Sequence, residues 1–182
     1  MRNEIRIAGF GGQGVITAGV LLAKALGQYG DFYVAQTQSY GPEARGGACK
    51  TDVVVSDTEI DYIKPLAIDV MAVMSQPALN AYQASLKDDG GLLVDSTLVN
   101  DIPARFTKVF SIPATDLAEN ELGLRVTANV IVFGALAKIT GWVTPEACKQ
   151  AIADIFPAKT LEKNYAAFDL GYTQSYTGRK NI

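Results

Sequence analysis

Residues 5–30 place a short strand, a glycine cluster and a helix in direct succession. The segment IRIAGF has the alternating and β-branched apolar residues of a buried strand, and it leads straight into GGQG. Apolar residues then recur at helical spacing from Val15 to Tyr29, and Gly30 supplies a stop. A strand, a glycine turn and a helix in this order predict the start of a Rossmann-like α/β domain.

The segments that follow predict a mixed sheet. FYVAQTQ reads as a second strand, and because it completes a βαβ unit we expect it to run parallel to the first strand. Residues 39–47 are too few for a parallel crossover, which needs about a dozen residues. The strand CKTDVVVS is therefore predicted to be antiparallel to FYVAQTQ. Apolar runs predict further strands over residues 68–74, 90–96 and 106–112.

Helical patterns fill the rest of the chain. They extend over residues 77–86, 125–141, 145–156 and about 161–172. The pairs Ser75 with Pro77 and Thr144 with Pro145 suit the first turns of two of these helices. No repeat or linker divides the chain, so we expect one domain over residues 1–182. Its predicted fold is a three-layer α/β/α Rossmann-like domain with a mostly parallel mixed sheet, in which ligands bind at the carboxyl ends of the strands.

The residue types that the chain lacks exclude several kinds of chemistry. It has no histidine, so His-based catalytic triads and His-based zinc sites are excluded. Its two cysteines, Cys49 and Cys148, are 99 positions apart and lie outside any CxxC pattern. The chain by itself therefore cannot ligate an iron–sulfur cluster or a Cys-rich zinc site, and both cysteines are interpreted as small core residues.

Charge and hydropathy patterning limit the partners and the location. The formal net charge is -3, from 16 basic and 19 acidic residues that are spread without blocks. Nucleic acids and membranes are therefore not expected partners. The sequence shows neither the charged and apolar regions of a signal peptide nor an apolar run long enough to span a bilayer, which predicts a cytoplasmic location.

The glycine cluster leaves its function open. Gly9, Gly11 and Gly14 match the GxGxxG pattern of dinucleotide-binding turns. The NAD version also needs an acidic residue about 20 positions later, where this chain has the neutral segment AQTQ. A phosphate-binding loop of the NTPase type is also disfavoured, since Val15 and Ile16 replace the Lys and Ser/Thr that it requires. Anion binding, dinucleotide binding and a tight turn without a ligand remain as alternatives.

A second segment, SYGPEARGG, joins two of the predicted strands and mixes rigid, charged and flexible residues. Glu43 and Arg45 can pair with each other, or Arg45 can bind a phosphate or a carboxylate, for which its planar guanidinium is suited. The alternative is an ordinary turn with a solvated ion pair of little energetic weight.

Together the two segments resemble a known family. GFGGQGVITAGVLLAKAL followed by QSYGPEARGG is similar to the signature pair of the gamma subunit of thiamine-dependent 2-oxoacid:ferredoxin (acceptor) oxidoreductases. The resemblance continues through VMSQPALNAY, GGLLVDS, IPATDLA and RVTANVIVFGALAKITG. The chain looks most like the gamma subunit of a 2-oxoglutarate enzyme, although pyruvate, branched-chain and indolepyruvate enzymes have similar subunits.

The resemblance implies a multi-subunit oxidoreductase that oxidatively decarboxylates a 2-oxoacid to an acyl-CoA and passes two electrons to ferredoxin or flavodoxin. Coenzyme A is then a co-substrate, and thiamine diphosphate and iron–sulfur clusters belong to alpha, beta and ferredoxin-like delta subunits. The present chain would carry no tightly bound cofactor, no metal and no catalytic residue, would be inactive in isolation and could form a homo-oligomer there. The alternatives are an independent dinucleotide-binding oxidoreductase and a purely structural assembly subunit.

The resemblance also assigns site residues by position. The family's glycine loop falls on Gly9, Gly11, Gly12, Gln13 and Gly14. Its second motif falls on Ser39, Tyr40, Gly41, Pro42, Glu43, Arg45, Gly46 and Gly47, and Asn129 falls in a helical segment expected near the same edge of the sheet. We expect these loops to dock on the thiamine-binding subunits and to shape the active-site entrance or the coenzyme A path. Contacts to a coenzyme A phosphate would come from Gly11, Gly12, Gln13, Gly14 and Arg45.

Overall fold

The computed structural model describes residues 1–39, 47–174 and 177–180, with no side-chain description for the last of these ranges. Within them, seven strands form one sheet in the order β2-β3-β1-β4-β5-β6-β7. The strands are β1 (Arg2–Phe10), β2 (Tyr33–Gln38), β3 (Ala48–Ser56), β4 (Ile68–Val73), β5 (Leu86–Asp95), β6 (Lys108–Ile112) and β7 (Thr177–Lys180). β1, β4, β5 and β6 pair in parallel, whereas β3 is antiparallel to both β1 and β2, and β7 is antiparallel to β6.

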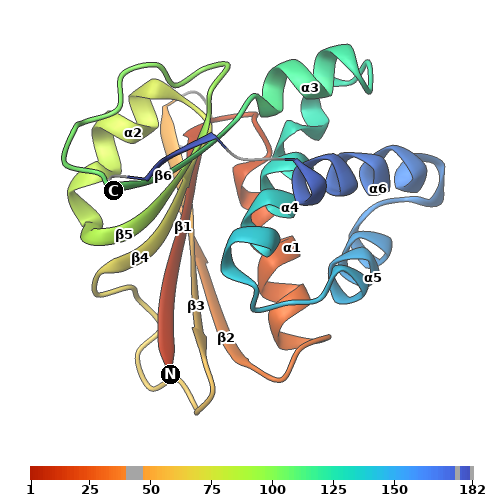
Figure 1. The fold of residues 1–182 in the computed structure, drawn as a ribbon. Coiled ribbons are helices and arrows are strands. Elements are labelled where there is room, and N and C mark those ends of the chain that lie inside the picture. The colour runs from red at the N-terminus through yellow and green to blue at the C-terminus, as the bar shows by residue number, and fades with distance from the viewer. Residues whose placement is uncertain (40–46, 175–176, 181–182) are drawn as a thin grey trace.

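Helices cover both faces of the sheet unequally. They are α1 (Val15–Gly27), α2 (Gln76–Tyr82), α3 (Ala114–Asn120), α4 (Ala128–Thr140), α5 (Pro145–Ile155) and α6 (Ala158–Thr173), with short 3₁₀ turns at Gln83–Ser85 and Arg125–Thr127. Figure 1 shows α2 on one face and α1, α4, α5 and α6 on the other. We refer to these as the α2 face and the α1 face. The predicted three-layer α/β/α class with a mixed sheet is thereby confirmed.

The order of the first three strands differs in one respect from the expectation. β2 does run in the same direction as β1, but β3 lies between them and pairs with both. The physical reason is burial: Val53, Val54 and Val55 are all buried in β3, while β2 is more polar and stays at the edge. The antiparallel pairing of β2 and β3 was predicted correctly from the short connection between them.

Several boundaries also differ. β7 was not predicted, because the segment TGRK has no strand-like pattern and is extended only through its pairing with β6. The helix expected from residue 125 begins at Ala128, after a 3₁₀ turn. Two caps are confirmed: Ser75 Oγ accepts from the Ala78 N–H at 3.4 Å, and Thr144 Oγ1 accepts from the Ala147 N–H at 3.2 Å.

The core consists of two apolar clusters, one on each face of the sheet. Strand alternation sends Ile5 and Ile7 into the larger cluster on the α1 face and Ala8 into the smaller one on the α2 face. Cys49 and Cys148 both lie in the larger cluster, 3% and 0% exposed, which confirms their prediction as core residues. The core thus holds β1 rigidly, and the glycine turn follows at its carboxyl end.

Candidate functional site at the carboxyl edge of the sheet

The four parallel strands β1, β4, β5 and β6 end at the same edge of the sheet, where the glycine turn also lies (Figure 1). The first residue of β3, Ala48, pairs with Phe10, the last residue of β1. The Gly11 N–H donates to the Gly47 carbonyl oxygen at 3.2 Å. The structure therefore brings the end of the second motif against the glycine turn, as the sequence led us to expect.

The glycine turn needs glycine at two positions for its backbone. Gly12 has φ +98° and Gly14 has φ +74°, a region that L side chains rarely adopt. Gly14 is the N-cap of α1, and the Ala18 N–H donates to its carbonyl oxygen at 3.0 Å. α1 has neither a side-chain cap nor an acidic residue in its first turn, so the positive end of its dipole is not neutralised there.

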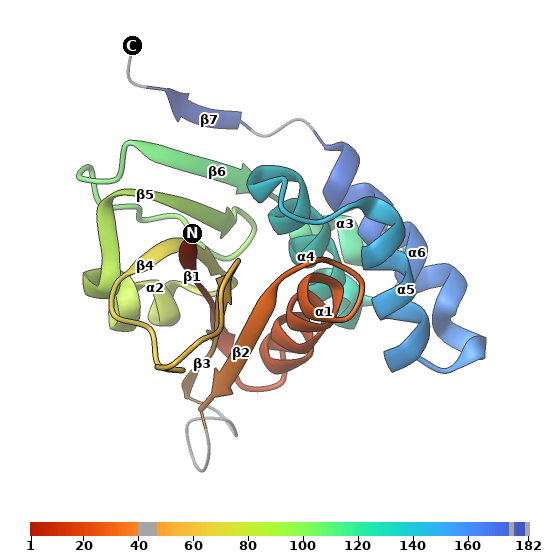
Figure 2. The same ribbon diagram turned by 90° about the horizontal axis from the view of Figure 1, so that it is seen from below.

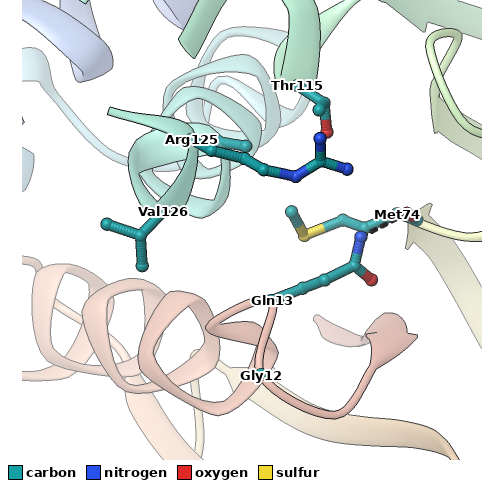
Figure 3. Close-up of a pocket in the computed structure, with 7 residues that line it drawn as sticks. Gly12, Gln13, Met74, Thr115, Arg125 and Val126 are labelled. Atoms are coloured by element: carbon teal, nitrogen blue, oxygen red, sulfur yellow. Dashed lines mark hydrogen bonds between the residues drawn. The ribbon is translucent and has the colours of Figure 1, made fainter. Parts of the chain in front are cut away.

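Gln13 ties the turn to the neighbouring strand. Its amide oxygen accepts from the Phe10 N–H at 2.5 Å, and its amide nitrogen donates to the Met74 carbonyl oxygen at 2.9 Å (Figure 3). Gly9 leaves room for this side chain, since a Cβ at Gly9 would lie 2.7 Å from Gln13 Oε1. Gln13 therefore links the end of β1 to the residue after β4.

Asn129 holds the turn from the other side. It is 4% exposed in the first turn of α4, and its amide nitrogen donates to the Gly14 carbonyl oxygen at 3.1 Å. A Cβ at Gly14 would lie 2.4 Å from the same nitrogen. The turn is thus fixed by two side-chain amides, that of Gln13 within the turn and that of Asn129 on α4.

A pocket of about 280 Å³ opens between the glycine turn and the first turns of α3 and α4. Its described lining residues are Gly12, Gln13, Met74, Thr115, Arg125, Val126 and Ala128. In Figure 3 the Arg125 side chain extends across the pocket towards Thr115 and Met74. Among these lining residues Arg125 carries the charge, so the pocket suits an anionic group better than a cationic one.

Hydrogen bonds and ion pairs around the pocket determine which of its side chains are available to bind a ligand. Asp95, 0% exposed at the end of β5, accepts from the Thr115 hydroxyl at 2.5 Å and from the Thr115 N–H at 3.1 Å. The Thr115 hydroxyl proton is therefore already used. Arg125 pairs with Glu119, but both side chains are more than two-fifths exposed, and such a pair is weak enough for a ligand to compete with it. α4, which begins beside the pocket, also lacks a side-chain cap and a first-turn acid.

The structure does not describe all the residues that the sequence singled out. Tyr40, Gly41, Pro42, Glu43, Arg45 and Gly46 lie outside the described residues. Ser39 and Gly47 flank them: Ser39 Oγ accepts from the Lys50 N–H at 3.2 Å, and the Ser39 N–H donates to the Lys50 carbonyl oxygen at 2.9 Å.

Sequence reasoning did not identify Met74, Thr115 and Arg125 as pocket residues. They come from three segments that no spacing rule connects. The signal that could have suggested Arg125 is its place directly before the apolar run of α4.

Metal and thiol chemistry have little support in the described part of the chain. No group of three or more His, Cys, Asp or Glu side chains is placed there to hold a metal ion. Burial raises the pKa of Cys148 to about 12 and also raises that of Cys49, so both thiols stay protonated at neutral pH. Among the described helices none has the length and apolarity needed to cross a bilayer.

Fold and site together define a Rossmann-like α/β domain with a rigid glycine turn and an anion-compatible pocket at the carboxyl edge. Residues 4–174 match the pyruvate ferredoxin/flavodoxin oxidoreductase family, and the chain belongs to this family. This confirms the resemblance that the paired motifs indicated.

The similar proteins align with this chain over almost its whole length. It is 49% identical to the 2-oxoglutarate synthase subunit KorC of Methanothermobacter thermautotrophicus, with 94% of each chain covered. It is 33% identical to the pyruvate synthase subunit PorC of Methanocaldococcus jannaschii, with 94% of this chain and 96% of the relative covered. The crystal structure of the keto/oxoacid ferredoxin oxidoreductase gamma subunit from Geobacter sulfurreducens matches with a TM-score of 0.87 at 38% identity, covering 94% of this chain and 95% of that one.

Proposed function

We propose that the chain is the gamma subunit of a complex that oxidatively decarboxylates 2-oxoglutarate to an acyl-CoA. The observation that carries the choice of substrate is the difference in identity, 49% to a 2-oxoglutarate synthase subunit against 33% to a pyruvate synthase subunit, each over nearly the full length. Family membership favours this function over an independent dinucleotide-binding oxidoreductase.

In this proposal other subunits hold the redox cofactors. An iron–sulfur cluster is held by four protein ligands, commonly thiolates, and this chain has two cysteines and no histidine. Both cysteines are buried, on β3 and α5. Thiamine diphosphate and the clusters are therefore assigned to alpha, beta and ferredoxin-like delta subunits, with ferredoxin or flavodoxin as the electron acceptor and coenzyme A as the co-substrate.

The substrate assignment can be tested on the reconstituted complex. We expect reduction of ferredoxin to depend on coenzyme A, on this chain and on 2-oxoglutarate, with much lower rates for pyruvate and 2-oxoisovalerate. Equal or higher rates with pyruvate would contradict the assignment. Full activity of the complex prepared without this chain would support the structural-subunit alternative instead.

For the role of the site, we infer that the carboxyl edge docks on the thiamine-binding subunits and shapes the active-site entrance. Two observations support this. Phe10 and Val126, at the glycine turn and at the pocket, are large apolar residues that are 45% and 57% exposed. The turn between them is held rigidly by Gln13 and Asn129, which lowers the entropy lost when a partner binds.

A matched pair of variants tests the docking surface. Val126→Glu should weaken assembly with the thiamine-binding subunits, because it buries a charge in the proposed interface. Leu66→Glu is the control, since Leu66 is 77% exposed and lies beside Glu4 near the amino end of β1. Co-purification and sedimentation would measure assembly. If the two variants assemble equally well, the carboxyl edge is not the docking surface.

The pocket favours a narrower role in coenzyme A binding. Its cationic Arg125 and the beginning of α1, which lacks a side-chain cap, suit a phosphate or a carboxylate. We infer that Arg125 contacts the phosphates of coenzyme A, together with the glycine turn and Arg45.

Steady-state kinetics of the complex would test this contact. Arg125→Gln should raise the KM for coenzyme A by about tenfold to a hundredfold, because a charge-assisted hydrogen bond contributes about 1.5–3 kcal/mol and about 1.4 kcal/mol corresponds to a factor of ten. The KM for the 2-oxoacid should stay unchanged. Arg105→Gln serves as the control, since Arg105 is a partly exposed arginine that pairs with Asp88 away from the pocket. An unchanged KM for coenzyme A in the Arg125 variant would exclude the contact.

A further inference from the structure

The described sheet has two outer strands, β2 and β7, which lie at opposite edges (Figure 2). An outer strand presents unpaired N–H and C=O groups along one side, and proteins usually protect such an edge with charges, prolines, bulges or a very short strand. β7 follows this practice: it has four residues, TGRK, of which two are basic.

β2 has none of these protections. Its sequence, YVAQTQ, contains no charged residue and no proline. It pairs with β3 in an unbroken register from Tyr33↔Ser56 to Gln38↔Thr51, so no bulge turns the edge away. Tyr33 is 55% exposed, and the remaining residues of the strand are half-buried. The edge is regular, neutral and accessible, which are the properties of a strand that pairs with another chain.

The side chains of β2 are divided between the two faces of the sheet. Thr37 pairs with Asp52 of β3, and Asp52 in turn pairs with Arg6 of β1 and binds its side chain, so all three lie on the α2 face. Because side chains alternate along a strand, Tyr33 and Ala35 lie on the α2 face as well. On the α1 face, the Gln36 amide is held by Thr51 Oγ1 at 2.8 Å. A groove of about 470 Å³ lies on that side between β2 and α1, and its cation Lys24 is already paired with Asp154 at 3.1 Å. Among the described residues that line this groove, none would bring an unpaired charge into the interface.

We propose that β2 pairs antiparallel with β2 of a second copy of this chain, about a two-fold axis perpendicular to the sheet at Ala35. Such an axis keeps each face of the sheet on its own side, so residues that oppose each other must share a face. Ala35 then opposes itself, and the exposed Tyr33 opposes Thr37 of the second copy. Two-fold symmetry brings the same short segment of both copies together around the axis, and a strand without charges allows this without repulsion.

This surface is separate from the carboxyl-edge docking surface, and the proposal does not depend on the proposed enzymatic function. It gives a location to the homo-oligomer that was predicted for the isolated chain. An extended strand of a different subunit would need the same edge, so finding one there would contradict the pairing of two copies.

The first test is the oligomeric state of the full chain, measured by sedimentation over a range of concentrations. We expect a dimer whose Kd rises about tenfold or more in Ala35→Lys, because two like charges then meet on the axis. Thr37→Lys serves as a second variant in case Ala35→Lys is poorly folded, and far-ultraviolet circular dichroism checks the fold of both. Leu66→Lys, at the amino end of the sheet, should leave the Kd unchanged. A monomer at all concentrations, or a dimer indifferent to both β2 variants, would overturn the proposal.

The second test is chemical. Ala35→Cys should form a disulfide between two copies under mild oxidation, since directly opposed side chains in an antiparallel pair have Cβ atoms about 4.5–5.5 Å apart. Ala104→Cys is the matched control, since Ala104 is an exposed alanine in the loop before β6, which lies at the other side of the sheet from β2. The native Cys49 and Cys148 are buried and should not react. Absence of the Ala35→Cys crosslink in the folded dimer, or equal crosslinking of both variants, would contradict the register.

Discussion

The contact between Gly14 and Asn129 gives a quantitative test of how the glycine turn is built. Gly14→Ala should destabilise the chain through two separable effects. An L residue at φ +74° costs roughly 1–2 kcal/mol, and the new Cβ would lie 2.4 Å from the Asn129 amide nitrogen, an overlap that costs roughly a further 1–3 kcal/mol. We therefore expect a loss of about 3 kcal/mol in the free energy of unfolding.

Asn129→Ala alone should cost about 1–2 kcal/mol, because it removes the hydrogen bond to the Gly14 carbonyl oxygen. In the double variant most of the overlap is relieved, since the nearest remaining atom of residue 129 is its Cβ at 3.2 Å, which is a tight contact but no longer a clash. The double variant should then be at least about 1 kcal/mol more stable than the sum of the two single losses predicts.

Gly12→Ala is the matched control. Gly12 also has a positive φ, +98°, but a Cβ there meets no atom within 4 Å. It should show the backbone cost alone, and its loss should add to that of Asn129→Ala within about 0.5 kcal/mol. Urea unfolding followed by circular dichroism measures all five variants. The reasoning fails if Gly14→Ala costs no more than Gly12→Ala, or if the Gly14 and Asn129 losses are simply additive.

Three other variants test the packing and the buried ionisable groups. Gly171→Ala should lower the free energy of unfolding by about 1–3 kcal/mol, because the new Cβ would overlap the Ile131 carbonyl oxygen of α4. This loss should exceed the gain from the higher helix propensity of alanine, and an increase in thermal stability would refute the close approach. Cys148 has its pKa raised from 9.0 to about 12 by burial, so its contribution to stability is complete below about pH 9 and is lost as the pH rises towards 12. Urea unfolding between pH 8 and about 11 should therefore show a weaker pH dependence in Cys148→Ala than in the parent chain. Asp52→Asn should cost about 3–5 kcal/mol, since it leaves the buried Arg6 guanidinium without its bidentate partner, and a loss below about 1 kcal/mol would show that the pair is not needed.

Features that depend on near neighbours in the chain could be predicted from the amino-acid sequence alone. Period-two and helical patterns located six of the strands and the main helices, and Ser75 and Thr144 marked two helix starts correctly because a cap needs only the next three residues. The short connection after β2 determined that β3 would be antiparallel to it. The paired motifs were enough to indicate the family.

The contacts between distant segments could not be predicted in this way, and they are visible in the folded chain. β3 lies between β1 and β2 because its apolar run gains more from a central position than the polar β2 does, and β7 is a strand only because β6 offers it an edge. The pocket and the edge of β2 have the same origin. Arg125 joins the glycine turn across more than a hundred residues of sequence, and β2 is an outer strand only because of the strand order. Local pattern carries no information about such contacts, since they depend on the register and packing of the whole sheet.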